Sequence, residues 1–279
     1  MLEKVDLTKK ISKEEYKAKM PQMEIELGRL QRECRELKIP VMIVFEGFGA
    51  SGKGVQIGKL IQSMDPRGFQ VFPIKAETED ERMHPFLWRF WTKTPEAGRI
   101  AIFDGSWYRK VLIDRFEKRT REKEIETAFH SIEAFEKQLT DGGTILVKLL
   151  LDIDQKEQKK RFEKLLEKKE TAWRVSQGDR ERNAKYSEYA AMMEEVLYRS
   201  DTKSAPWTVI EATDRRFATV KIYMTVIHAL AEAVEAVQRR RMEEQAIKAA
   251  EQVSGQQEAA EIMRQAGGEL EMLQSSVLS

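Results

Sequence analysis

Five short runs of apolar residues stand out along the chain, and charged stretches with helical spacing of their apolar positions separate them. The runs are residues 41–45, 69–74, 100–103, 144–151 and 207–210. Strands covered by helices on both faces carry such uninterrupted runs, whereas a strand with one solvated face alternates. Strands that alternate with helices indicate βαβ units and a parallel sheet. The pattern therefore predicts an α/β fold with a five-stranded parallel sheet flanked by helices.

The segments outside these runs are charged and are predicted to be helical. The predicted parts are an N-terminal helical arm (1–40), a main domain (41–237) with a helical lid at about 154–200, and a helical or partly disordered C-terminal tail (238–279). The arm carries a capping-box pattern, Ser12 with Glu15, and its helix is expected to be interrupted near Pro21.

Composition narrows the possible classes of protein. A single cysteine, Cys34, excludes a disulfide framework and a cysteine-rich metal site, and His84, His130 and His228 have no metal-ligand spacing. Because no secretory leader or uninterrupted run of about 18 apolar residues occurs, we expect a cytoplasmic protein without a membrane partner. Since 48 Lys and Arg balance 47 Asp and Glu, no nucleic-acid partner is expected.

The strongest motif directly follows the first apolar run. Gly-Phe-Gly-Ala-Ser-Gly-Lys-Gly at residues 47–54 has the GxxxxGK spacing of a P-loop, between a strand and a helix. Glycines let successive backbone amides converge on phosphate oxygens, the helix N-terminus adds a positive dipole end, and Lys53 supplies a mobile cation. The predicted phosphate-binding residues are Gly47, Gly49, Ala50, Ser51, Gly52, Lys53 and Gly54. A glycine-rich turn without a ligand is the alternative.

An acidic residue ends the third apolar run. P-loop enzymes organise Mg²⁺ with a carboxylate at the end of a neighbouring strand, and Asp104 stands at that place. A strand-terminal aspartate alone is more often a helix N-cap. Paired with the P-loop, Asp104 is predicted to be a metal ligand, the more so because Gly54 replaces the usual Ser or Thr of the loop.

Taken together, these motifs resemble the family-2 polyphosphate kinases. The matching segments are residues 47–54, 65–69, 86–89, 103–108 and 205–207, in consistent order over about residues 41–230. The likeness is greatest to the N-terminal type of domain in polyphosphate:AMP phosphotransferases, which carry two such domains. The resemblance implies a P-loop kinase-like fold and Mg²⁺-dependent phosphoryl transfer between inorganic polyphosphate and a nucleotide, AMP or ADP, by a homo-oligomer.

The resemblance also implies roles for individual residues. Lys53, Asp104 and Arg161 match catalytic positions, with Asp104 holding the metal, and Arg89, Lys110 and Arg115 match phosphate-binding positions. In two places the chain departs from the family: Gly49 replaces a metal-binding aspartate, and Gly105 replaces a phosphate-contacting arginine. Each loss is expected to lower the rate by about 10²-fold. The alternatives are therefore a non-catalytic phosphate- or polyphosphate-binding relative and an ATP-dependent nucleotide kinase.

Charge is unevenly distributed despite the near-zero total. Residues 156–169 hold seven basic and three acidic side chains, and residues 104–123 hold seven and four. A solvated helix face is the simpler interpretation of each stretch alone, but both fall where the resemblance predicts phosphate contacts. Trp173, Tyr186 and Tyr189 are expected to pack within the lid, with stacking on a nucleobase as the alternative.

Overall fold

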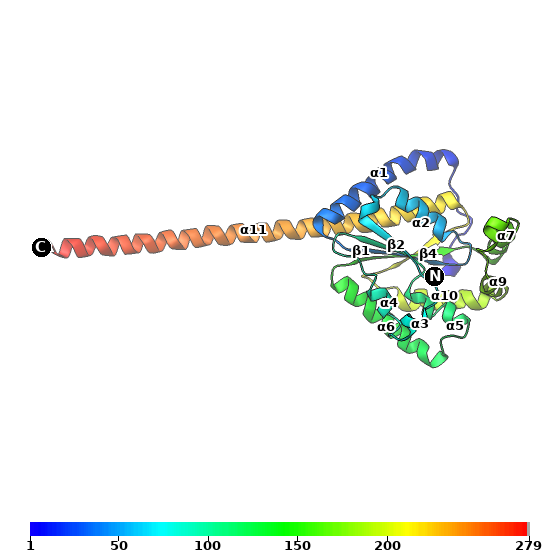
Figure 1. The fold of residues 1–279 in the computed structure, drawn as a ribbon. Coiled ribbons are helices and arrows are strands. Elements are labelled where there is room, and N and C mark those ends of the chain that lie inside the picture. The colour runs from blue at the N-terminus through cyan, green and yellow to red at the C-terminus, as the bar shows by residue number, and fades with distance from the viewer. Residues whose placement is uncertain (278–279) are drawn as a thin grey trace. The chain divides into compact units, whose positions relative to one another are not determined.

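The computed structural model describes the backbone of residues 1–277 and the side chains of residues 1–248 (Figure 1). The chain divides into two units, Met1–Val234 and a second unit that begins at Glu235. The first unit contains the sheet and all the predicted site residues. Within the described part of the second unit the backbone is helical.

A five-stranded parallel sheet forms the centre of the first unit, as predicted. The strands are β1 (Val41–Gly47), β2 (Phe69–Pro73), β3 (Ile100–Asp104), β4 (Ile145–Asp152) and β5 (Trp207–Glu211). Their order is β2-β3-β1-β4-β5, so β1 lies between β3 and β4, with Val41 opposite both Ile100 and Ile145. β1 is buried along its whole length, whereas the edge strand β2 is half-buried. The predicted fold class is confirmed.

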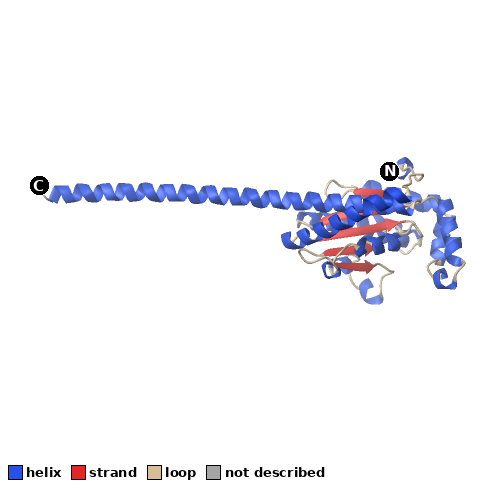
Figure 2. Ribbon diagram, turned by 90° about the horizontal axis from the view of Figure 1, so that it is seen from above, coloured by secondary structure: helices blue, strands red, loops and turns tan. Residues whose placement is uncertain are grey.

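Helices cover both faces of this sheet. The helices are α1 (Lys13–Leu37), α2 (Lys53–Gln62), α3 (Glu79–Arg82), α4 (Trp88–Trp91), α5 (Ile113–Phe116), α6 (Glu122–Asp141), α7 (Gln155–Leu166), α8 (Lys169–Ala172), α9 (Gln177–Ala184), α10 (Tyr186–Ser200) and α11 (Arg215–Val277), with short 3₁₀ turns η1 (Leu2–Lys4), η2 (Pro66–Gly68) and η3 (Trp107–Lys110). α1, α2 and the start of α11 lie on one face, and α4, α6 and α10 lie on the other (Figure 1). Figure 2 shows the strands beneath the helices of the first face.

The N-terminal helix runs through its proline, so the predicted interruption near Pro21 is wrong. The capping box at Ser12 and Glu15 is present, and α1 continues without a break to Leu37. Proline removes one backbone hydrogen bond from a helix interior. Burial of one face of α1, which includes Leu27 and Leu30 at 0% and 1% exposure, offsets that loss.

The start of α11 is a core helix of the first unit. Residues 215–248 are long and apolar enough to cross a membrane by length and composition alone, and half of the most apolar window is buried against the protein. Ala218, Ile222, Val226 and Leu230 are among its buried residues. Packing against the sheet therefore accounts for the apolar character of this helix.

Candidate active site

The P-loop turns sharply between β1 and α2. Gly47 has φ +136°, and a Cβ there would collide with the Leu151 carbonyl of β4, so only glycine fits. Lys53 Nζ donates to the Gly47 carbonyl at 2.9 Å, which folds the side chain over the loop. Among the described residues, no acceptor pairs with the amides of Gly49, Ala50 and Gly52. The loop therefore offers unpaired N–H groups beside an ammonium group at the start of a helix, which is the chemistry of an anion site.

Asp104 lies beside the first turn of α2. β3 pairs with β1 so that Asp104 is opposite Phe45, and the Asp104 Oδ2 atom is 3.9 Å from the place a Cβ of residue 54 would occupy. Its carboxylate accepts no hydrogen bond from any residue whose placement is described. The structure therefore brings Asp104 and the P-loop together, as predicted.

A second carboxylate, Glu46, lies under the loop and was missed by the sequence analysis. Glu46 is buried at the end of β1 and accepts a 2.7 Å hydrogen bond from Ser106 Oγ. Burial raises the pKa of Glu46, and the neighbouring Lys53 charge opposes that shift. The bond ties β1 to the turn that follows Asp104. The available signal was a charged residue between an apolar strand run and the first glycine of the P-loop.

The lid packs directly on the P-loop. The Phe48 ring stacks on Tyr186 with centroids 4.8 Å apart and meets Tyr189 edge-on at 6.0 Å. The Tyr186 hydroxyl donates to the Ile153 carbonyl, and Tyr189 is buried. These two tyrosines therefore pack within the lid and against the loop, while Trp173 is 76% exposed.

Arg161 reaches the loop from α7 but meets its carbonyl side. The acceptors of its guanidinium group are Glu157 Oε1 at 2.8 Å and the backbone oxygens of Ala50 at 3.1 Å, Ser51 at 3.0 Å, Ala212 at 2.8 Å and Thr213 at 3.0 Å. A guanidinium group has five N–H donors, so all of them are used. In this conformation Arg161 has no donor left for a phosphate.

A narrow cleft of about 10 Å³, barely enough to admit one water molecule, lies next to the β3 end. Its lining includes the predicted residues Arg89 and Lys110 and also Arg109, which the sequence analysis missed although it follows the Asp104 motif directly. Arg89 pairs with Glu81 at 3.3 Å and Arg109 with Asp114 at 3.3 Å. The buried Nε atom of Arg89 has no hydrogen-bond partner in the described chain, whereas that of Arg109 faces Asp114 Oδ1 as an ion pair without hydrogen-bond geometry.

Arg115, the remaining predicted basic residue, does not line this cleft. Its guanidinium group bridges α5, α6 and α10, because it donates to Glu122 and Glu195, each at 2.6 Å. The contacts hold α10 of the lid region against the segment that follows β3. The structure therefore assigns Arg115 to contacts with α6 and α10 and not to the lining of the cleft that includes Arg89 and Lys110.

Gly49 and Gly105, the two glycines that replace charged residues of the family, have different surroundings. A Cβ at Gly49 would be 2.9 Å from Asp179 Oδ1 and 3.1 Å from the Phe162 ring, so lid residues fill the space of the family's aspartate. Gly105 has φ +75°, and a Cβ there would meet nothing closer than 3.8 Å. What disfavours another residue at position 105 is therefore the left-handed backbone conformation, which a residue with a Cβ adopts only at an energetic cost.

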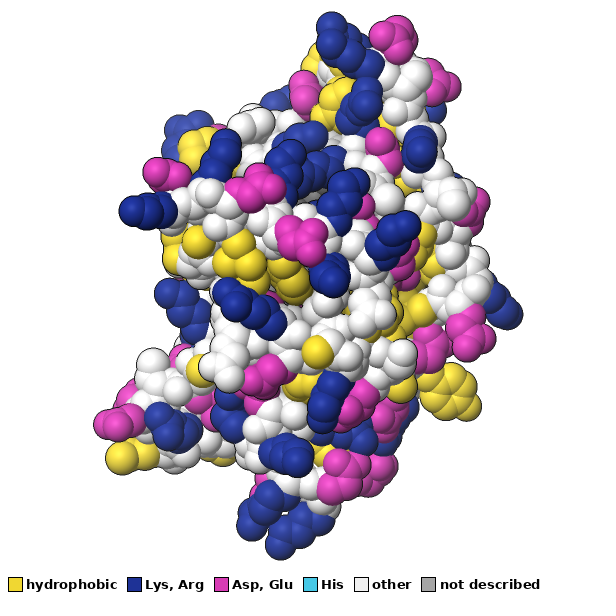
Figure 3. Space-filling model, turned by 90° about the vertical axis from the view of Figure 1, so that its right-hand side faces the viewer, with side chains coloured by type: hydrophobic (Ala, Val, Ile, Leu, Met, Phe, Trp, Pro, Cys, Tyr) yellow, Lys and Arg dark blue, Asp and Glu magenta, His cyan; other side chains and the backbone are white. Residues whose placement is uncertain are grey.

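The surface beyond the carboxyl ends of the strands is rich in charge. Figure 3 faces this end of the first unit and shows Lys and Arg side chains spread over it with Asp and Glu among them. Lys156, Lys159 and Lys160 of α7 are exposed there. Cationic groups are therefore available on the helix that contacts the loop, although they do not form an unbroken basic patch.

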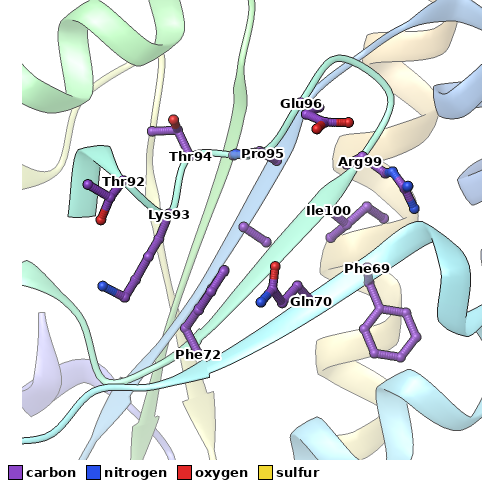
Figure 4. A pocket seen from close by; sticks show the side chains of 11 residues that line it. Phe69, Gln70, Phe72, Thr92, Lys93, Thr94, Pro95, Glu96, Arg99 and Ile100 are labelled. Carbon is purple, nitrogen blue, oxygen red and sulfur yellow. The ribbon is translucent and has the colours of Figure 1, made fainter. Parts of the chain in front are cut away.

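A larger cavity of about 290 Å³ lies elsewhere (Figure 4). It is lined by the starts of β2 and β3, including Phe69, Gln70 and Ile100, and by the segment that contains Lys93. The starts of parallel strands lie at the opposite edge of the sheet from the P-loop. This cavity therefore does not contribute to the phosphate site.

A parallel sheet with a P-loop after β1, an aspartate at the end of β3 and a helical lid defines a P-loop kinase-like phosphate-binding protein. The family model described as "Polyphosphate kinase 2" matches residues 10–240, and the chain belongs to that family.

Named relatives agree with this membership. The chain is 36% identical over 233 residues to the polyphosphate:AMP phosphotransferase of Pseudomonas syringae pv. tomato, covering 84% of this chain and 47% of the relative. It is 31% identical to the NDP-polyphosphate phosphotransferase 3 of Ruegeria pomeroyi, covering 77% and 72%. A solved structure from Pseudomonas aeruginosa PA01, assigned to polyphosphate kinase 2, superposes with a TM-score of 0.81 at 35% identity, covering 84% and 50%. The chain thus spans about half the length of the polyphosphate:AMP phosphotransferase that it matches.

Proposed function

We propose that this chain transfers phosphate between inorganic polyphosphate and a nucleotide. The observation that carries the proposal is the P-loop, whose amides at Gly49, Ala50 and Gly52 are unpaired beside Lys53 and Asp104. Family membership and the names of the relatives support this choice of reaction. Those names include AMP and nucleoside diphosphates, and we propose AMP or ADP as the acceptor here.

In this proposal the loop binds the donor phosphates. Amides that point into the turn hydrogen-bond phosphate oxygens, and Lys53 exchanges the Gly47 carbonyl for a phosphate oxygen when donor arrives. Phosphoryl transfer demands little covalent chemistry of the protein, so fixed positive charge around the transferred group supplies most of the rate enhancement. Lys53 is accordingly the proposed main catalytic cation.

Asp104 is the proposed Mg²⁺ ligand. Mg²⁺ commonly takes one or two carboxylates and completes its shell with waters and substrate phosphates. The unpaired Asp104 carboxylate next to the α2 N-terminus fits that requirement, since Gly54 leaves the space between them open. A bound Mg²⁺ would supply positive charge that offsets the negative charge of the phosphates.

The cleft beside β3 is the proposed approach for the acceptor phosphate. Arg89 and Arg109 are held there by carboxylates, and Lys110 lies 5.8 Å from the centre of the Phe86 ring. A phosphate can replace Glu81 or Asp114 as the partner of its arginine without leaving a buried cation unpaired. The narrowness of the cleft implies that these side chains rearrange when the acceptor binds.

The test is polyphosphate-driven phosphorylation of AMP and of ADP with Mg²⁺. We expect turnover by the wild-type chain and a loss of at least about 10²-fold in Lys53→Ala, because the main cation is removed. Lys137→Ala on α6, whose side chain is exposed, is the matched control and is expected to match the wild type. Wild-type turnover no higher than that of Lys53→Ala would refute the proposal.

A further inference from the structure

Three consecutive carbonyl groups of the P-loop accept hydrogen bonds from one helix of the lid. Gln158 Nε2 donates to the Gly49 oxygen at 3.0 Å. Arg161 NH1 donates to the oxygens of Ala50 at 3.1 Å and Ser51 at 3.0 Å. Both donors come from α7 and stand three residues apart, so they project from the same side of the helix. One turn of α7 therefore holds the outer side of the loop.

The planarity of the peptide bond converts these contacts into an orientation for the amides. In a trans peptide the carbonyl of one residue and the N–H of the next point in opposite directions. Fixing the Gly49 and Ser51 carbonyls toward α7 therefore turns the amides of Ala50 and Gly52 away from α7. The intervening Ser51 amide donates to the Phe48 carbonyl at 3.2 Å, and this bond closes a turn. Ala50 and Gly52 are thus left with amides directed to the inner side of the loop.

The backbone at Ala50 is in a conformation that needs such support. Its φ of 56° lies in the left-handed region, which a residue with a Cβ adopts only at an energetic cost. Two of the peptide groups around this residue are held by Gln158 and Arg161. The contacts with α7 therefore stabilise the backbone at the point where the loop is least favourable on its own.

The two donors are themselves held rigidly. Gln158 is 1% exposed, and its Oε1 atom accepts from Asn183 Nδ2 of α9 at 2.8 Å. Arg161 is 8% exposed, and its NH2 group binds the turn after β5 through the Ala212 and Thr213 carbonyls. The amide donors of the loop are thus tied through α7 to the lid and to β5.

We propose that Gln158 and Arg161 are positioning residues that orient the P-loop amides of Ala50 and Gly52 toward phosphate. In this conformation neither side chain is available to the phosphate: Arg161 has no free donor, and Gln158 is 1% exposed with its Nε2 group bonded to the Gly49 carbonyl. The phosphate part of this inference rests on the proposed function, whereas the control of loop conformation does not. It replaces the interpretation of Arg161 as a catalytic residue that faces the phosphates.

Two conservative variants test the proposal. Gln158→Met keeps the length of the side chain and removes both its donor to Gly49 and its acceptor for Asn183. Arg161→Lys keeps the charge and removes the planar group with five donors. The matched controls are Gln177→Met and Arg180→Lys, which change exposed residues of the same lid. Should Arg161→Lys fail to fold, Gln158→Met carries the test alone.

The first measurement is the backbone conformation of Ala50 in the ligand-free protein, from NMR chemical shifts or a crystal structure. We expect Ala50 to leave the left-handed region, at least partly, in both variants and in neither control. The second is binding of tripolyphosphate without Mg²⁺ by calorimetry. We expect the Kd to rise about tenfold in the variants. In turnover, the KM for polyphosphate should rise and kcat should fall, while the KM for the acceptor nucleotide stays unchanged.

The outcomes separate this inference from the proposed function. If the variants keep Ala50 in its left-handed conformation, or if they bind tripolyphosphate as tightly as the wild type does, the positioning role is refuted. If the wild-type chain itself fails to bind tripolyphosphate, the proposed function and the phosphate part of the role fail together. The Ala50 conformation still decides in that case whether α7 controls the loop.

Discussion

The lid residue Asp179 occupies the space that a side chain at residue 49 of the P-loop would need. Asp179 Oδ1 accepts from Arg182 NH2 at 2.8 Å, and Asp179 Oδ2 accepts from Ser176, whose side chain caps α9. The Asp179 carboxylate is therefore fixed where a side chain at residue 49 would point. The absence of a side chain at Gly49 thus allows close packing of the lid on the loop.

We predict that Gly49→Asp lowers polyphosphate binding rather than restoring a metal ligand. The new Cβ would be 2.9 Å from Asp179 Oδ1, and the two carboxylates would repel each other, so the lid must move outward. A loss of about 1–3 kcal/mol in unfolding free energy is expected from the overpacking. Polyphosphate calorimetry and thermal melting check both expectations.

A matched control is available on α2. Gly58 has open space where its Cβ would be, so Gly58→Asp adds the same side chain without the steric conflict. Adding Asp179→Ala to Gly49→Asp should recover part of the lost polyphosphate binding, because the repelling carboxylate is removed. A gain of turnover in Gly49→Asp alone would contradict the prediction, because it would show that Asp179 does not prevent a side chain at residue 49.

Asp152, at the end of β4, lowers the stability of the folded protein when its side chain ionises. Burial, together with the charges of Asp154 and Glu211, raises the pKa of Asp152 to about 6. Between about pH 4 and pH 6 the folded state keeps a proton on Asp152 that the unfolded state has released. Asp152 therefore costs no stability below about pH 4, and its destabilising effect grows as the pH rises through 6. The ionised Asp152 side chain therefore destabilises the fold at neutral pH.

We predict that Asp152→Asn is more stable than the wild type at pH 7 by about 1–3 kcal/mol. The difference in unfolding free energy between the two proteins should shrink as the pH falls from 7 to 4. Urea unfolding at several pH values measures it, with Asp80→Asn at an exposed position as control. A difference that is constant with pH would contradict the assignment of this titration to Asp152.

Among the elements, β4, α6 and the end of α10 are joined by a buried polar network. Lys148 of β4 is 0% exposed and donates to Glu136 Oε2 at 2.7 Å and to the Ser200 carbonyl at 2.6 Å. Glu136 Oε1 accepts from Trp107 Nε1 at 2.9 Å and from the Tyr108 hydroxyl at 2.5 Å. The network connects the core of the sheet to the turn that follows Asp104.

We predict that Lys148→Met destabilises the protein by about 3–5 kcal/mol, because it leaves Glu136 as a buried carboxylate without its cation. The double variant Lys148→Met/Glu136→Gln should regain much of this loss, since no uncompensated charge remains. Denaturant unfolding provides the values, and Lys137→Met on the exposed side of α6 is the control. Equal stability of Lys148→Met and Lys137→Met would show that the pair contributes nothing.

How far the sequence predicts an element depends on whether its signal is local. The strands were predictable because β1 and β4 lie between helices and carry uninterrupted apolar runs, and the P-loop because its spacing is fixed by phosphate geometry. The unbroken α1 was not, because packing of its buried face outweighs the local effect of Pro21. Gln158 gave no signal either, since its role depends on a loop 109 residues earlier in the chain.

For the first unit as a whole, the proposed binding of polyphosphate depends more on where the charged side chains lie than on the net charge. The chain has a net charge of +1, yet α7, the lid helix that contacts the P-loop, carries several exposed lysines. If polyphosphate binds at the loop as proposed, a long chain would extend beyond the loop toward these lysines, whereas a tripolyphosphate would end near it. Chain length should therefore decide how much the surface charge contributes to binding.

We predict that Lys156→Ser/Lys159→Ser raises the KM for long-chain polyphosphate by about three- to tenfold, because two exposed cations each contribute up to about 1 kcal/mol. The Kd for tripolyphosphate should change by less than about twofold, and the effect on long chains should fade at high salt as exposed charges are screened. Both residues are exposed on α7, while the side chains of Gln158 and Arg161 are buried on the side that holds the loop. Lys137→Ser/Lys203→Ser, at exposed positions outside both basic stretches, is the matched control. If long and short chains lose affinity equally, the lysines act on the loop, and long polyphosphate does not bind along α7.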